Sequence, residues 1–126
     1  MMGKYHTEPF KIKQFWKAFN EKTGGSGPDA YLGCKLLAEE TQELLDAVDN
    51  GDSEAHVLKE ICDVAYVLHA VTLAYGFEDK YEAAFNLVHQ NNLMKPESGT
   101  VNSDGKLVKA PDHPSVLPAL RKLLNM

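Results

Sequence analysis

The sequence has few of the features that mark membrane, secreted or nucleic-acid-binding proteins. Its longest apolar stretch, residues 64–77, is broken by His69 and Thr72 and is too short to span a bilayer. No charged-then-apolar leader opens the chain. We interpret the only two cysteines, Cys34 and Cys62, as reduced, packed thiols. The net charge of −5 leaves no basic stripe for a nucleic acid polymer. We therefore expect a cytoplasmic protein without a membrane or nucleic acid partner.

Apolar periodicity and helix-breaking residues predict an all-α fold in the 126 residues, which suffice for one domain. The helices are expected at about 8 or 9 to 22, 30 to 50, 53 to 75 and 78 to 94. After Pro96 the composition turns to Gly, Ser, Asp and Pro, and residues 101–108 are typical of a small β-hairpin on an Asp-Gly turn. A short last helix is expected from 118 or 119. We assign 1–95 to a helical core and 96–126 to a C-terminal extension of the same domain.

Four acidic residues lie symmetrically about a predicted turn at Gly51: Glu40, Glu43, Glu60 and Asp63. Within each pair the spacing is three residues, which places both carboxylates on one side of a helix. Gly51 can end one helix in a left-handed conformation, and Asp52 or Ser53 can cap the next. A hairpin folded here sets Glu40 opposite Asp63 and Glu43 opposite Glu60.

These acids share helix faces with apolar residues, so they are expected to point partly inward. Four gathered carboxylates repel one another and lose hydration unless a cation compensates them. Oxygen-only ligands favour a hard ion, Mg²⁺ with Mn²⁺ as the alternative. The competing interpretation is a solvated acidic face, which helices often carry.

The motifs in residues 37–44 and 60–66 resemble the EExxE…ExxD signature of the MazG-like all-α nucleoside triphosphate pyrophosphohydrolases. Residues 88–95 and 104–111 resemble downstream segments of one branch of that superfamily, in the same order. Leu93-Met94 stands where Met-Ser is expected, and Ala110 where Gly is usual. The resemblance implies a four-helix bundle that assembles as a homo-oligomer.

The same resemblance implies a Mg²⁺-dependent enzyme that cleaves (d)NTP between the α and β phosphates, giving a nucleoside monophosphate and pyrophosphate. Its expected role is the removal of unwanted nucleotides from the pool. A phosphoribosyl-ATP pyrophosphatase of histidine biosynthesis is the alternative, ranked lower because the segment around Asn92 and Lys95 resembles the MazG-like branch. An alternative of another class is a non-enzymatic helical dimer that binds a protein partner.

Further residues are candidates for catalysis or substrate binding. Glu39 or Glu43 is expected to orient or deprotonate the attacking water. The candidates for substrate contacts are Asn92, Lys95, Lys109, Tyr66 and Trp16. The first three form a predicted triphosphate clamp, although a lysine at a helix C-terminus also complements the helix dipole. Trp16 either stacks on a nucleobase or belongs to the core, and Tyr66 either bonds a ligand or caps the core.

The third predicted helix is apolar almost all round between residues 61 and 75. Such a helix needs cover on every side, and four short helices from one chain can scarcely supply it. We therefore predict a homodimer or homotetramer. The alternative is a monomer in which the tail covers the exposed stripe, but the tail offers little apolar surface.

Overall fold

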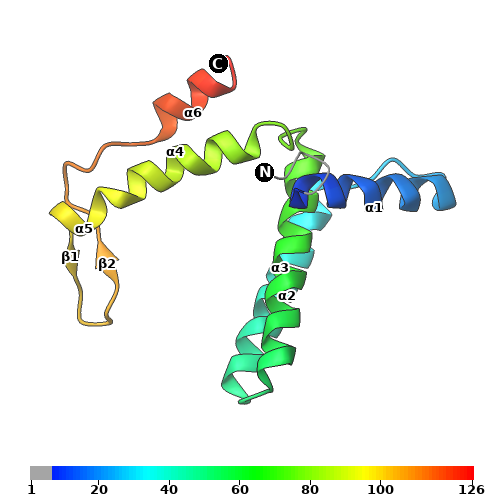
Figure 1. The fold of residues 1–126 in the computed structure, drawn as a ribbon, viewed down its shortest axis with the longest axis horizontal. Coiled ribbons are helices and arrows are strands. Elements are labelled where there is room, and N and C mark those ends of the chain that lie inside the picture. The colour runs from blue at the N-terminus through cyan, green and yellow to red at the C-terminus, as the bar shows by residue number, and fades with distance from the viewer. Residues whose placement is uncertain (1–6) are drawn as a thin grey trace. The chain divides into compact units, whose positions relative to one another are not determined.

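The computed structural model describes residues 7–126, which form two compact, mainly helical units with a boundary between Glu78 and Asp79. The elements of the first unit are α1 (Glu8–Thr23), α2 (Ala30–Asp49) and α3 (Glu54–Ala74), as drawn in Figure 1. Those of the second are α4 (Tyr81–Leu93), α5 (Lys95–Ser98), β1 (Thr100–Val101), β2 (Leu107–Val108) and α6 (Leu117–Leu123). The prediction of a mainly helical protein is confirmed.

Local capping and turn residues fix the start of α2 and the turn between α2 and α3. The Asp29 carboxylate accepts a hydrogen bond from the backbone N–H of Leu32 at 2.8 Å, which starts α2. Ser53 caps α3 in the same way. Gly51 has φ 66°, a left-handed conformation that glycine adopts without a side-chain clash. The predicted hairpin is therefore confirmed, and α2 and α3 lie side by side along their length (Figure 1).

Close packing against α3 places the other helices of the first unit. A Cβ atom on Gly33 of α2 would lie 2.9 Å from Val71 Cγ2, so a larger residue would push the two helices apart. The helix α1 packs across α3, where Ile12 and Ala70 are buried. His69 of α3, also buried, pairs through Nε2 with Glu8 Oε2 of α1 at 2.7 Å. These contacts hold α1 and α2 against α3.

The second unit begins with α4, which starts at Tyr81 rather than at the expected residue 78. The helix α5 was not predicted, because Pro96 was interpreted as a helix end although proline also fits the first turn of a helix. The strands β1 and β2 pair antiparallel, with Thr100 opposite Val108, and Gly105 in the connecting turn has φ 80°. The predicted β-hairpin and short last helix are both confirmed.

Three further expectations concern the domain boundaries, the cysteines and membrane-spanning helices. The compact units divide at 78/79, and the assignment of 96–126 to the same domain as 1–95 stays a prediction. Cys34 and Cys62 are free, as expected, but both are exposed rather than packed. Within residues 7–126 we find no helix with the length and apolar character that a membrane span requires.

Candidate metal centre

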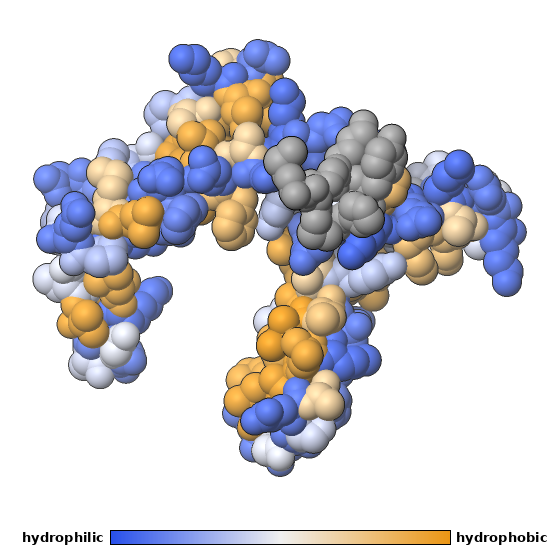
Figure 2. Space-filling view, viewed as in Figure 1, coloured by the Kyte–Doolittle hydropathy of each residue, from blue (hydrophilic) through white to orange (hydrophobic). Residues whose placement is uncertain are grey.

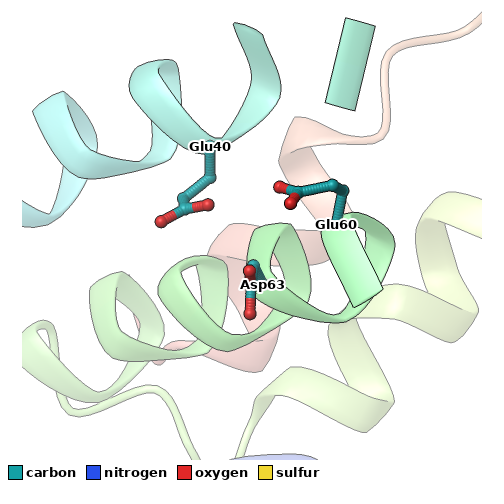
Figure 3. Close-up of side chains that lie close together, drawn as sticks. All are labelled: Glu40, Glu60 and Asp63. Atoms are coloured by element: carbon teal, nitrogen blue, oxygen red, sulfur yellow. The ribbon is translucent and has the colours of Figure 1, made fainter. Parts of the chain in front are cut away.

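Three of the four predicted acids converge on the α2–α3 hairpin. Ligand oxygens of Glu40, Glu60 and Asp63 lie within 4.8 Å of one another. Figure 3 shows Glu40 projecting from α2 toward α3, where Glu60 and Asp63 project into the same space. Glu60 is only 4% exposed, whereas Glu40 and Asp63 are half-buried. The arrangement is a small carboxylate cluster with one wall against the protein core.

The fourth acid, Glu43, lies beside this cluster rather than within it. Its exposed side chain is within hydrogen-bonding range of Glu40, its neighbour one turn back on α2. Counting from the turn predicts Glu43 opposite Glu60, yet the ligand oxygens of Glu60 lie close to those of Glu40. A role for Glu43 as a metal ligand therefore stays a prediction, and its place at the open side suits contact with water.

Two buried oxygens in the cluster lack a partner. Glu40 Oε2 and Glu60 Oε2 form no hydrogen bond with any residue in the range 7–126. Buried carboxylate oxygens without donors are costly, because desolvation is not offset by a hydrogen bond or an opposite charge. A divalent cation bound between Glu40, Glu60 and Asp63 would satisfy both oxygens. The donor set, oxygen only, fits Mg²⁺ or Mn²⁺.

Basic side chains on α3 partly balance the cluster. Lys59 Nζ lies 2.7 Å from Asp63 Oδ2 and 3.4 Å from Glu60 Oε1. The hydrogen bond to Asp63 and the charges of both acids raise the pKa of Lys59. His56 bridges Glu60 Oε1 at 3.2 Å and Asp52 Oδ2 at 3.0 Å. Lys59 is well exposed, so its ammonium group can swing away when a metal ion takes its place.

Glu40 forms no ion pair with a basic side chain of residues 7–126, and its pKa is raised above the ordinary 4.5. Desolvation is the largest cause, followed by the hydrogen bond with Glu43 and the charges of Glu43, Asp63 and Glu60. A raised carboxyl pKa favours the protonated form in the folded state. Its contribution to stability is present below the unfolded pKa and is lost as the pH rises through the folded pKa.

We therefore expect Glu40→Gln to stabilise the metal-free protein at pH 7, because glutamine fixes the neutral state without repulsion. The midpoint of thermal unfolding in chelator should rise by about 3 °C, a shift typical of a change below 1 kcal/mol in a small domain. The gain should disappear at pH 3, where Glu40 is protonated in the wild type. Glu39→Gln, an exposed neighbour, is the matched control and should change little. A lower midpoint for Glu40→Gln would mean that Glu40 makes a stabilising ion pair.

The other predicted site residues fall into two groups. Glu39 is exposed on α2 one residue before Glu40. Tyr66 is 45% exposed on α3, with its ring edge-on to Phe15 at 5.7 Å between centroids. Trp16 on α1 is half-buried and lines a pocket. These residues all belong to the first unit, as the acids do.

Asn92, Lys95 and Lys109 belong instead to the second unit. Asn92 and Lys109 are exposed, and Lys95 is half-buried at the start of α5. The acids belong to the first unit and these three residues to the second, so the triphosphate clamp stays a prediction. Asn91, which no sequence motif indicated, donates through its amide to the Pro114 carbonyl at 2.9 Å, and its Oδ1 lies 2.7 Å from His113 Nε2.

Comparison with known proteins places this geometry in a family. Residues 12–92 match the phosphoribosyl-ATP pyrophosphohydrolase family over more than half of the chain, a span that contains the whole acidic cluster. The chain belongs to this family. The phosphoribosyl-ATP pyrophosphohydrolase family is part of the MazG-like all-α superfamily, so the resemblance noted in the sequence is confirmed. No curated protein and no solved structure matches the chain.

Membership of the phosphoribosyl-ATP pyrophosphohydrolase family decides between the classes of function considered above. The chain is a pyrophosphohydrolase that acts on a phosphorus-containing anhydride and binds a nucleotide substrate. The non-enzymatic helical dimer is therefore wrong as an account of its function. The matched family also bears the name of the pyrophosphatase that the sequence analysis ranked second. Lys95 and Lys109 lie outside the matched residues.

Proposed function

We propose that the protein cleaves a nucleoside triphosphate between the α and β phosphates in a Mg²⁺-dependent reaction. The products are a nucleoside monophosphate and pyrophosphate. The observation that supports this proposal most directly is the convergence of Glu40, Glu60 and Asp63, where two buried oxygens have no hydrogen-bond partner among residues 7–126. A nucleotide-pool role and a cytoplasmic location follow from this substrate class and remain predictions.

Glu40, Glu60 and Asp63 would hold the metal ion. When bound, Mg²⁺ neutralises polyphosphate charge and makes the phosphorus atom accessible to an anionic nucleophile. The nearly full burial of Glu60 holds one side of the site in a fixed position. Pre-positioned ligands of this kind reduce the reorganisation needed in the transition state.

Glu43 is the better candidate of the two for activating water. Its carboxylate lies beside Glu40 and is exposed, so it can accept a proton from a water molecule next to the metal ion. Glu39 is one residue from Glu40, about 100° around the helix at ~3.6 residues per turn. The charges that raise the pKa of Glu40 are those of Glu43, Asp63 and Glu60, and Glu39 is not among them. We therefore assign the base to Glu43 and leave Glu39 as a surface charge.

The substrate can be any nucleoside triphosphate or phosphoribosyl-ATP, which shares the triphosphate. The matched family favours phosphoribosyl-ATP by its name. The segment around Asn92 and Lys95 and the tail around Lys109 favour the broader MazG-like substrates, because their motifs resemble that branch. We propose that these three residues bind the triphosphate in either case, with ammonium groups as point charges and the Asn amide as a donor.

We also propose that the protein acts as a homodimer or homotetramer. Large apolar side chains of the α2–α3 hairpin are exposed, among them Leu45, Val48, Leu58, Ile61 and Leu68. Apolar side chains gather along one side of this hairpin in Figure 2. Exposed apolar surface on this scale is typical of an interface, and a second copy of the chain offers the same surface.

Product analysis tests the proposed reaction. With Mg²⁺ and a panel of nucleoside triphosphates and phosphoribosyl-ATP, we expect pyrophosphate and a monophosphate in equal amounts from at least one substrate. Chelator should abolish the release, because without a cation the carboxylates of Glu40, Glu60 and Asp63 repel the polyphosphate. Orthophosphate with a nucleoside diphosphate would place the cut at the γ phosphorus and overturn the mechanism. The ratio of kcat/KM for phosphoribosyl-ATP to that for ATP decides between the two substrate classes.

A further inference from the structure

A pocket of about 330 Å³ lies in the first unit, between α1, the loop after it and the end of α3. Its walls include Lys13, Trp16, Lys17, Asn20, Ser26 and Leu73. Leu73 is ten residues beyond Asp63 on α3, which corresponds to about 15 Å along the helix axis. The pocket is therefore separate from the carboxylate cluster, and the reaction proposed above assigns it no role.

Close contacts hold the pocket in shape. The Asn20 side-chain amide donates to the Gly27 carbonyl at 2.8 Å, which ties the loop to α1. A Cβ atom on Gly27 would lie 2.7 Å from Trp16 Cζ3, so the loop backbone rests directly on the indole ring. Phe19 packs edge-on against the same ring, with 5.0 Å between centroids. The aromatic wall is thus pre-positioned, which lowers the entropic cost of binding a ligand.

The charge of the pocket is opposite to that of the protein. The chain carries a net charge of −5, yet Lys13 and Lys17, one helical turn apart on α1, both line this pocket. Lys17 forms no ion pair within residues 7–126. Lys13 is only weakly engaged, at 3.7 Å from Glu78. Two ammonium groups at one rim favour an anion.

The other residues that line the pocket indicate which kind of anion it can bind. The indole of Trp16 and the side chain of Leu73 offer apolar surface to a ring. Ser26 offers a hydroxyl group, and Asn20 Oδ1 is a buried acceptor without a partner in residues 7–126. A sugar hydroxyl group can donate to such an acceptor. The volume is at the lower end of small-molecule pockets, roughly 300–1,000 Å³, so the ligand is small.

We propose that this pocket binds the phosphate monoester of a ribosyl 5-phosphate group. The phosphate lies between Lys13 and Lys17, the ribose lies against Trp16, and a ribose hydroxyl donates to Asn20. Two kinds of molecule contain this group. One is a substrate whose triphosphate binds at Glu40, Glu60 and Asp63 and whose phosphoribosyl end reaches the pocket. The other is a free nucleoside 5′-monophosphate. The first source rests on the proposed function, whereas the second does not.

The single tryptophan of the chain, Trp16, reports directly on this pocket. Titration with ribose 5-phosphate in the presence of chelator should give a saturable change in tryptophan fluorescence, and calorimetry should give the same Kd. Lys17→Ala should weaken binding by about tenfold, as expected for the loss of one charged contact. Lys17→Arg should retain most of the affinity. Lys11→Ala, the same change on the same helix but outside the pocket, should leave Kd unchanged.

Three results would overturn the proposal: no saturable binding by either method, an equal effect of Lys17→Ala and Lys11→Ala, or inorganic phosphate binding as tightly as ribose 5-phosphate. Glu60→Gln should bind ribose 5-phosphate as the wild type does, so failure of the metal centre is distinguishable from failure of this pocket. Competitive inhibition of phosphoribosyl-ATP hydrolysis by ribose 5-phosphate would identify the substrate as the source. Binding of AMP without such competition would identify a free monophosphate.

Discussion

Glu60→Gln should lower turnover by at least about 1000-fold at saturating Mg²⁺, equivalent to about 4 kcal/mol of transition-state stabilisation. Glutamine keeps the shape of the buried side chain but removes its charge and one strong metal-binding oxygen. The amide also places an NH₂ donor in a space that faces Glu40. The loss should therefore appear both in kcat and in the Mg²⁺ concentration needed for half-maximal activity.

The measurement is pyrophosphate release over a wide range of Mg²⁺ concentrations. Glu54→Gln is the matched control, since it makes the same change in the first turn of α3 at an exposed position, and it should stay within about twofold of wild type. Circular dichroism must show that both variants fold, because Glu60 also contacts His56 and Lys59. Retention of more than a tenth of wild-type turnover by folded Glu60→Gln would remove Glu60 from the metal centre.

The two helices and the turn that carry this site could be predicted from the sequence, because helix caps and turns depend on residues close together in the chain. Asp29 and Ser53 cap their helices through their own side chains, and Gly51 adopts the left-handed conformation that the turn needs. Each depends on residues within one helical turn. The hairpin, its register to within a turn and the presence of the acids on facing helices therefore follow from residue types and spacing.

Which acid of α2 lies next to Glu60 could not be predicted in the same way. Counting outward from Gly51 set Glu43 opposite Glu60, but counting ignores how far each helix is rotated about its axis. That rotation depends on packing, such as the contact of Gly33 with Val71. As a result Glu40 meets both acids of α3, and Glu43 lies at the side. The Lys59–Asp63 pair, by contrast, has the four-residue spacing that sequence inspection can detect.

The pocket around Trp16 depends on tertiary contacts and so gave no sequence signal. Asn20 reaches the Gly27 carbonyl across a loop, and Leu73 comes from another helix. From the sequence, Trp16 fits either the core or a ligand contact, and in the structure it lines a pocket. Similarly, Asn91 holds His113 and Pro114 of the tail, a contact 22 and 23 residues away that spacing on α4 does not reveal.

The second large expected effect is the loss of oligomer assembly when an exposed apolar residue of α3 is replaced by a charged one. Leu58, Ile61 and Leu68 follow the three- and seven-residue spacing of one helix face, and Ile61, in the middle, is 48% exposed in the single chain. If a second copy covers this face, Ile61→Asp buries an unpaired carboxylate in the interface. An uncompensated buried charge costs about 3–5 kcal/mol, which corresponds to a weakening of the dimer by at least ~100-fold.

We therefore expect Ile61→Asp to sediment as a monomer at micromolar concentrations at which the wild type is a dimer or tetramer. Ile61→Leu keeps the volume and apolar character of the side chain, so it should assemble as the wild type does. Because position 61 is half exposed in one chain, the monomer should still show helical circular dichroism, which separates loss of assembly from unfolding. A wild-type protein that sediments as a monomer would mean that the α3 stripe is covered within the chain. An Ile61→Asp variant that stays assembled would move the interface to another face of the hairpin.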